Sequence, residues 1–208
     1  MNSTNEPTLN EVFLNVRKAY RLLHDYQSMV RDAVRYISAQ LDIPLVGGRA
    51  RFADDARAGY RYLDMSSWDW LPMMGCEFMC LKTLGENEFL SLSYFIISDT
   101  GFIEGDDKMD DKENISDYEK ADKSSSKFAF ILRKTHWGTP LPFMENKVQM
   151  RNFIKEGGSL PDDLDKEGYV GKCYDMSCLA SESEADKVVS DILVFAKAKS
   201  WPLERKKK

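Results

Sequence analysis

The 208-residue sequence predicts an α+β protein in which an antiparallel sheet of about four to six strands packs against a long N-terminal helix and a C-terminal helix. Apolar residues recur at helical spacing near both ends of the chain, whereas in its middle they alternate with polar residues. The strand-like stretches are joined by turns and not by regularly alternating helices, which favours antiparallel pairing. We therefore expect a single domain over residues 1–208.

Residues 9–42 are expected to form one long helix. Thr8 and Glu11 fit a capping box at its start, and Pro44 disfavours helical geometry beyond Asp42. A helix of this length measures about 50 Å, so it must cross the whole sheet, kink, or extend beyond the sheet toward a partner. The apolar residues that share one face of this helix are Leu9, Val12, Val16, Ala19, Leu23, Tyr26, Val30, Ala33 and Ile37, widened by Phe13, Tyr20, Met29 and Val34.

This apolar face of the long helix has two interpretations. It can pack against the sheet as part of the core, or it can form the seam of a homodimer, because alternating spacings of three and four residues are also the pattern of a coiled coil. The aromatic residues and alanines within the face are atypical of a strict coiled-coil seam, which favours core packing. A contribution to a homodimer is kept as the alternative.

Residues 73–98 and 127–179 are expected to contain the sheet. Residues 89–98 predict a central strand, because their apolar side chains occupy both faces toward the end of the strand. Residues 127–135 predict another strand with regular alternation. One face of that strand is expected to carry Phe128, Phe130 and Leu132, and the other Ala129, Ile131 and Arg133.

The C-terminal part of the chain predicts one more strand and two helices. The strand is expected over residues 169–179, and the C-terminal helix over residues 181–200. Ser181 begins the second capping box of the chain, immediately before that helix. A shorter helix is expected over residues 143–156, where Gly157 ends it.

Residues 45–72 are expected to be irregular, with a turn at Gly47 and Gly48. Arginine and aromatic residues interleave here, a composition enriched at binding surfaces and suited to phosphate or single-stranded nucleic acid. The alternative is that nearby aspartates such as Asp54 neutralise the arginines and that the tryptophans cap the core. The candidate binding residues are Arg49, Arg51, Arg57, Arg61, Trp68, Trp70, His136 and Trp137.

Residues 99–126 predict a flexible acidic insertion between two strands. Together with Lys127, this stretch holds ten acidic residues and five lysines, whereas the net charge of the whole chain is −5. The rest of the chain is therefore nearly neutral. The acidic balance disfavours a nucleic-acid partner, although the arginine-rich segment could still present a local positive surface.

The four cysteines are expected to be buried thiols of a cytoplasmic protein. The polar start of the chain lacks the apolar core of a secretory signal, and disulfides are rare in the cytosol. Cys76 and Cys80 would stand about 13 Å apart along a strand, too far apart to share one zinc ion. Cys173 and Cys178 would point to opposite faces of another strand. No apolar run is long enough to span a membrane, and we expect no metal or cofactor.

The sequence contains no recognisable catalytic set. It has only two histidines, and neither the Gly-x-Gly-x-x-Gly pattern nor a P-loop is present. We therefore expect a non-enzymatic cytoplasmic protein that binds another protein as an accessory, regulatory or inhibitor-type domain, and that can form a homodimer. One alternative is a small-ligand sensor with an apolar cavity under the sheet, rimmed by residues such as Tyr94 or Arg133. The other is a divalent-metal-dependent phosphodiester hydrolase that uses Asp99 and Glu104.

Overall fold

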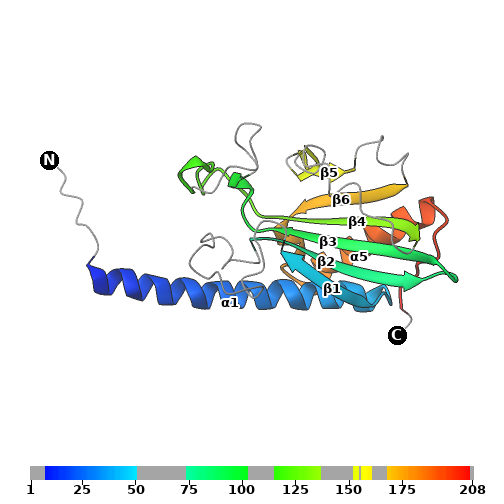
Figure 1. The fold of residues 1–208 in the computed structure, drawn as a ribbon, viewed down its shortest axis with the longest axis horizontal. Helices are drawn as coiled ribbons and strands as arrows, with labels where there is room; N and C mark the ends of the chain where they lie inside the picture. The colour runs from blue at the N-terminus through cyan, green and yellow to red at the C-terminus, as the bar shows by residue number, and fades with distance from the viewer. Residues whose placement is uncertain are drawn as a thin grey trace.

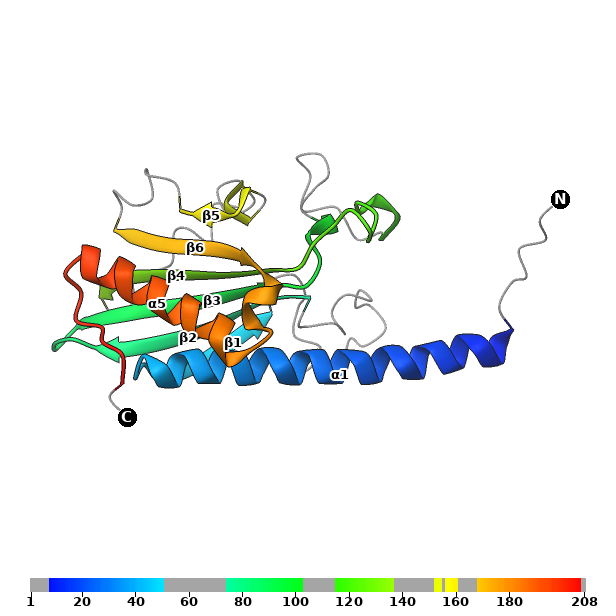
Figure 2. The same cartoon turned by 180° about the vertical axis from the view of Figure 1, so that it is seen from behind.

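The computed structural model describes residues 8–50, 74–102, 115–136, 152–154, 156–160 and 168–206. Within them, six strands pair in one antiparallel sheet with the order β1-β2-β3-β4-β6-β5 (Figure 1). The helices α1 (Leu9–Gln40) and α5 (Glu182–Ala198) lie on one face of this sheet (Figure 2). The predicted α+β fold is therefore confirmed. The strands are β1 (Leu45–Ala50), β2 (Gly75–Thr83), β3 (Glu88–Ile97), β4 (Lys127–His136), β5 (Gly158–Ser159) and β6 (Tyr169–Asp175).

Strand β3 is buried on both faces, as predicted for a central strand. Its side chains alternate between two hydrophobic clusters. Leu92 belongs to the cluster beneath the helices, which we call the helix-side face, and Phe95 belongs to the cluster on the opposite, far face. Strand β4 follows the predicted alternation, because Phe130 lies on the helix side and Ile131 on the far face.

The helix-side core joins the two ends of the chain. Helix α1 contributes Val34 and Ile37, and helix α5 contributes Val188 and Ile192, each of which is almost completely buried. Burial of an aliphatic side chain of this size stabilises the fold by about 1.5–3 kcal/mol. The apolar stripes of both helices therefore hold them against the sheet.

The far-face core is smaller and includes a segment outside the sheet. Phe153 and Ile154 are helical residues that pack against Phe95 and Ile131. Gly171 of β6 is paired with Ile131 of β4, and a Cβ atom at this glycine would clash with the carbonyl oxygen of Phe130. The close approach of β4 and β6 therefore requires glycine at this position.

The prediction of an irregular segment with a turn at Gly47 and Gly48 is wrong for its first residues. They form β1, an edge strand whose Gly48 pairs with Phe78 of β2. A Cβ atom at Gly48 would stand 3.0 Å from the Phe78 ring carbon Cδ1 and 3.2 Å from the carbonyl oxygen of Glu77. Glycine is thus needed here because β2 approaches closely, and not because the chain turns.

The last predicted strand ends at Asp175 instead of Leu179. The residues that follow form a 3₁₀ helix, η4 (Met176–Leu179). The backbone N–H of Met176 donates to the carbonyl oxygen of Ser126, and Leu179 is buried in the helix-side core. The chain therefore leaves the sheet after Asp175, and Leu179 packs in the helix-side core together with residues of α5.

The ends of the acidic segment at residues 99–126 are ordered. Two more 3₁₀ helices lie there, η2 (Thr100–Phe102) and η3 (Ile115–Asp117). The backbone N–H of Thr100 donates to Ser125 O at 2.8 Å, and the Ser126 hydroxyl donates to the carbonyl oxygen of Ser98 at 2.6 Å. These bonds close the neck of the segment. Its middle, residues 103–114, lies outside the described residues, so its predicted flexibility stays a prediction.

Candidate functional site

Helix α1 extends well beyond the sheet that its C-terminal part covers (Figure 1). The helix has 32 residues, which corresponds to a length of about 48 Å. Its buried residues are confined to the stretch from Val30 to Ser38, and every residue from Thr8 to Asp25 is exposed. We call Leu9–Asp25 the overhang. Of the three predicted outcomes for a helix of this length, extension beyond the sheet is the one observed.

The overhang is helical because its first turn is capped locally. The backbone N–H of Thr8 donates to Glu11 Oε2 at 2.7 Å, and the backbone N–H of Glu11 donates to Thr8 Oγ1 at 3.4 Å. Both halves of the predicted capping box are present. The hydrogen bond from the Thr8 backbone lowers the pKa of the Glu11 carboxyl, helped by the Thr8 hydroxyl. The start of the helix thus needs no tertiary contact to be fixed.

The pKa of the Glu11 carboxyl is lower in the helix than its ordinary value of 4.5. The stabilisation by the capping box is therefore fully present above pH 4.5 and is lost as the pH falls through the lowered pKa. We expect amide exchange in the first turn of α1 to accelerate on acidification, measured by NMR. In Glu11→Gln, which cannot ionise, that acceleration is expected to be absent. A first turn whose exchange shows the same pH dependence in both proteins would contradict the role of this carboxylate.

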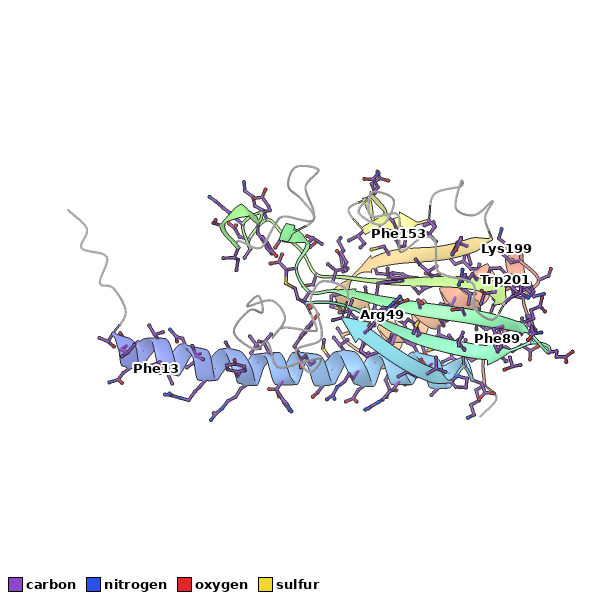
Figure 3. All side chains as sticks on the ribbon, viewed as in Figure 1. Phe13, Arg49, Phe89, Phe153, Lys199 and Trp201 are labelled. Atoms are coloured by element: carbon purple, nitrogen blue, oxygen red, sulfur yellow. The ribbon has the colours of Figure 1, made fainter. Side chains whose placement is uncertain are left out.

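The overhang carries an apolar face that no described residue covers. Leu9 is 68% exposed, Tyr20 69% and Leu22 72%. At about 100° per residue, the apolar side chains of this face, apart from Leu22 on its flank, point in the same general direction as Val30 and Val34, which are buried farther along the helix. Phe13 lies far out on the overhang, away from the sheet (Figure 3). The overhang face consists of Leu9, Val12, Phe13, Val16, Ala19, Tyr20, Leu22 and Leu23.

Most charged residues of the overhang lie away from this face. Lys18 and Arg21 project from the other side of the helix, whereas Arg17 lies at the edge of the face, four residues after Phe13. His24 is paired with Asp25 at 3.1 Å. Contiguous apolar surface of this kind usually marks an interaction site. Within the described residues, no helix is both long and apolar enough to cross a membrane.

Arg49, the first candidate binding residue, is paired with a buried carboxylate. Its Nε atom donates to Glu77 Oε2 at 3.2 Å, and the Ser93 hydroxyl donates to Glu77 Oε1 at 2.7 Å. Glu77 is completely buried, whereas the Arg49 side chain is 53% exposed. A buried carboxylate is costly unless it is hydrogen-bonded. The arginine therefore anchors the edge strand β1 to β2, and the serine connects the pair to β3.

We expect Glu77→Ala to lower the free energy of unfolding by about 2 kcal/mol, because it removes a fully buried side chain and leaves the buried Ser93 hydroxyl without its acceptor. Arg49→Ala is the matched control. Its guanidinium is half exposed and screened by solvent, and the carboxylate left behind still accepts from Ser93, so the expected loss is smaller, about 1 kcal/mol. Denaturant unfolding measures both variants. Equal losses would show that the partly exposed ion pair, and not burial of the carboxylate, carries the energy.

Arg133 and Tyr94 lie on opposite faces of the sheet. The buried Arg133 donates from Nη1 to the Tyr169 hydroxyl at 3.0 Å, and its guanidinium stands 5.5 Å from the centre of the Tyr169 ring. Tyr94 is completely buried on the helix side, where its hydroxyl accepts from Ser38 Oγ and its ring stacks on Phe128 at 5.8 Å. The two residues expected around one ligand cavity therefore do not share one.

His136 ends β4 in an exposed position. Its Nδ1 atom lies 3.3 Å from the carbonyl oxygen of Asn87, which precedes β3. The histidine thus has a partner at the end of the β3–β4 pair, and the structure does not bring it to Arg49. The remaining candidate binding residues lie outside the described residues, so their common surface stays a prediction: Arg51, Arg57, Arg61, Trp68, Trp70 and Trp137.

The cysteines are not arranged for nucleophilic chemistry. All four fall within the described residues, where they are thiols and not disulfides. Burial raises the pKa of Cys76 and of Cys178 to about 12, and that of Cys80 and of Cys173 to about 11. The thiolate is the reactive form, so these thiols react slowly at neutral pH.

Asp99, one of the two residues expected to take part in metal-dependent hydrolysis, has a structural role. Asp99 Oδ1 accepts from the backbone N–H of Gly101 at 2.7 Å, so this carboxylate caps the turn that begins the acidic segment. Glu104 lies outside the described residues. In the part of the chain that the structure describes, no three histidine, cysteine, aspartate or glutamate side chains gather to hold a metal ion.

Two features of the site were missed by the sequence reasoning. Glu77 could not be distinguished from an exposed strand residue, because its alternation with Cys76 and Phe78 predicts only which face it occupies. Leu22 lies on the flank of the helix, outside the predicted apolar stripe. The seven-residue spacing between Leu22 and Met29 indicates that this flank of the helix is apolar as well.

The fold and the site define an α+β protein with an antiparallel sheet and a projecting amphipathic helix. A family model described as PM0109 matches residues 6–202, so the chain belongs to the PM0109 family. No curated protein and no solved structure matches the chain.

Proposed function

We propose that this protein is a non-enzymatic, cytoplasmic protein-binding domain whose interaction surface is the overhang face of α1. The observation that carries the proposal is the exposure of an apolar helix face that is continuous with the buried stripe of the same helix. An isolated helix gains little from propensity alone, and most of its stability normally comes from packing of its apolar face. The overhang has the pattern for such packing, and none of the described residues packs against it.

The size of the overhang face suits a specific protein interface. Its large side chains expose roughly 100 Å² each, which gives about 700 Å² in all, close to the ~800 Å² that one partner contributes to a standard interface. Covering this area would contribute a hydrophobic free energy of the order of 15 kcal/mol before the costs of association. The face is thus large enough to bind an apolar helix or groove of a protein partner.

The buried polar groups support a binding domain over an enzyme. Glu77 and Arg133 are both bonded within the sheet, and the cysteine thiols have raised pKa values. In each case the group is engaged in holding strands together or is protonated at neutral pH. Most of the large hydrophobic side chains that the described residues expose belong to α1, so the surface that remains for function includes the overhang face.

Site-specific photo-cross-linking tests the proposal. The photoreactive residue p-benzoylphenylalanine replaces Val16 on the overhang face in one variant, and Arg21 on the opposite side of the helix in the control variant. Irradiation of expressing cells is expected to cross-link the position-16 variant to a discrete protein, identified by mass spectrometry, and the position-21 variant to none. Equal labelling at both positions, or none at position 16, would overturn the proposed surface.

A further inference from the structure

Building on the proposed function, we infer that the partner of the overhang is a second copy of this chain, and that the two overhangs pack as an antiparallel two-stranded coiled coil. Three observations carry this inference: the direction of the apolar face, the match of its residues when one helix is reversed, and the neutral positions beside it.

A parallel pairing of two α1 helices is excluded by the protein's own core. The overhang face and the buried residues Val30, Val34 and Ile37 lie on one side of the helix. In a parallel, in-register coil, these three residues would face their counterparts in the other copy. That space is already filled by the sheet and α5, against which the three residues pack. Reversing one helix places the two sheets at opposite ends of the pair, so both overhangs become accessible to each other.

The antiparallel arrangement has one register that matches the apolar residues. With Leu9 at position a of the heptad, Val16 and Leu23 also occupy a, and Val12, Ala19 and Tyr26 occupy d. Antiparallel coiled coils pair a with d. A two-fold axis between residues 17 and 18 achieves this pairing in every layer of the overlap. The layers are Val16 with Ala19 of the partner, Val12 with Leu23 of the partner, and Leu9 with Tyr26 of the partner.

The composition of these layers fits self-association. The central layers next to the axis contain Val16 and Ala19, whose small size allows the helices to approach closely. The outermost layer contains Tyr26, which is half-buried and hydrogen-bonded to Ser98 at 2.9 Å. The overlap therefore ends where the helix enters its own core. The length of the overhang and the length of the matched register agree.

Charge also permits pairing between identical chains. The positions that flank the seam, e and g, hold Phe13, Tyr20, Asn15 and Leu22 in the overhang. None is charged, so two copies bring no like charges together along the seam. Instead the apolar flanking side chains widen the contact. A charged helical partner would gain nothing from these positions, whereas a second copy presents the same apolar flanks.

Cysteine cross-linking of the full chain tests both the partner and the direction. Val16→Cys and Ala19→Cys chains are prepared separately and mixed, then oxidised mildly. In the antiparallel register the mixture is expected to form disulfide-linked dimers, because positions 16 and 19 face each other across the axis, while Val16→Cys alone links several-fold less. Arg21→Cys, on the opposite side, is the control, and the unmodified chain reports the background from its native cysteines, three buried and Cys178 half-buried.

Each outcome has a defined meaning. Preferential linkage in the mixture, together with a dimer mass by light scattering at tens of micromolar, supports the inference. Fast linkage of Val16→Cys with itself shows a parallel pair and overturns it. A monomer mass with background linkage in every sample also overturns it. In that last case, a photo-cross-link from position 16 to a different protein would still support the proposed function, so the two failures are distinguishable.

Discussion

Val16→Glu is expected to convert the proposed dimer of this protein into a monomer. Val16 lies in the layer next to the proposed two-fold axis, so the substitution introduces one carboxylate from each copy close to the centre of the interface. Each one replaces an apolar side chain and is left without a partner there. We expect the dissociation constant to rise at least 100-fold, which corresponds to about 3 kcal/mol. Light scattering coupled to chromatography measures the mass over a concentration series.

The matched control for Val16→Glu is Arg21→Glu on the opposite side of the overhang. It introduces the same carboxylate on the same helix and is expected to leave the mass unchanged. Both positions are exposed in the single chain, so neither variant is expected to change the unfolding of the sheet and α5. Loss of the dimer in both variants would mean that the net charge of the overhang, and not its apolar face, controls association.

Gly171→Ala is expected to have the largest effect on folding. A Cβ atom at this position meets the backbone carbonyl of Phe130, and it also lies 2.8 Å from Leu160 Cδ1 and 3.3 Å from Ile131 Cα. Since two of these neighbours are backbone atoms of the adjacent strand, the clash cannot be relieved by rotating a side chain. We expect a loss of at least about 3 kcal/mol in the free energy of unfolding, measured by denaturant titration.

Gly47→Ala in β1 is the control for Gly171→Ala. Its Cβ atom would meet only the flexible end of Met79, at 3.9 Å, which is an ordinary contact. The expected change in unfolding free energy is within about 0.5 kcal/mol, because the substitution also reduces the freedom of the unfolded chain. If both glycine variants lost the same stability, the close approach of β4 and β6 would not be the cause at position 171.

The periodicity of the sequence was sufficient to predict most elements of this fold. Alternation placed Phe130 and Ile131 on opposite faces of β4, and the spacing in the last helix predicted the buried side that contains Val188 and Ile192. These predictions are confirmed because side-chain direction follows directly from helix or strand geometry. The cap formed by Thr8 and Glu11 was predictable for the same reason, since it involves only residues of one turn.

Other features depend on residues that are distant in the sequence. Gly48 appeared to mark a turn, yet it pairs with Phe78 because a neighbouring strand was available to it. The burial of Glu77 and its bonds to Arg49 and Ser93 join three strands, and no local pattern encodes such an arrangement. The end of β6 at Asp175 is followed by burial of Leu179 in the helix-side core, which residues of α5 also form.

For helix α1, the sequence specified one apolar face from Leu9 to Ile37 but left its partner open between core and dimer. The three-dimensional arrangement divided this face, because the sheet and α5 cover it only from about Val30 onward and the overhang stays exposed. Apolar residues spaced alternately three and four apart predict which side chains lie on the same side of a helix. They do not predict what lies against that side, since coverage depends on where the sheet ends in space.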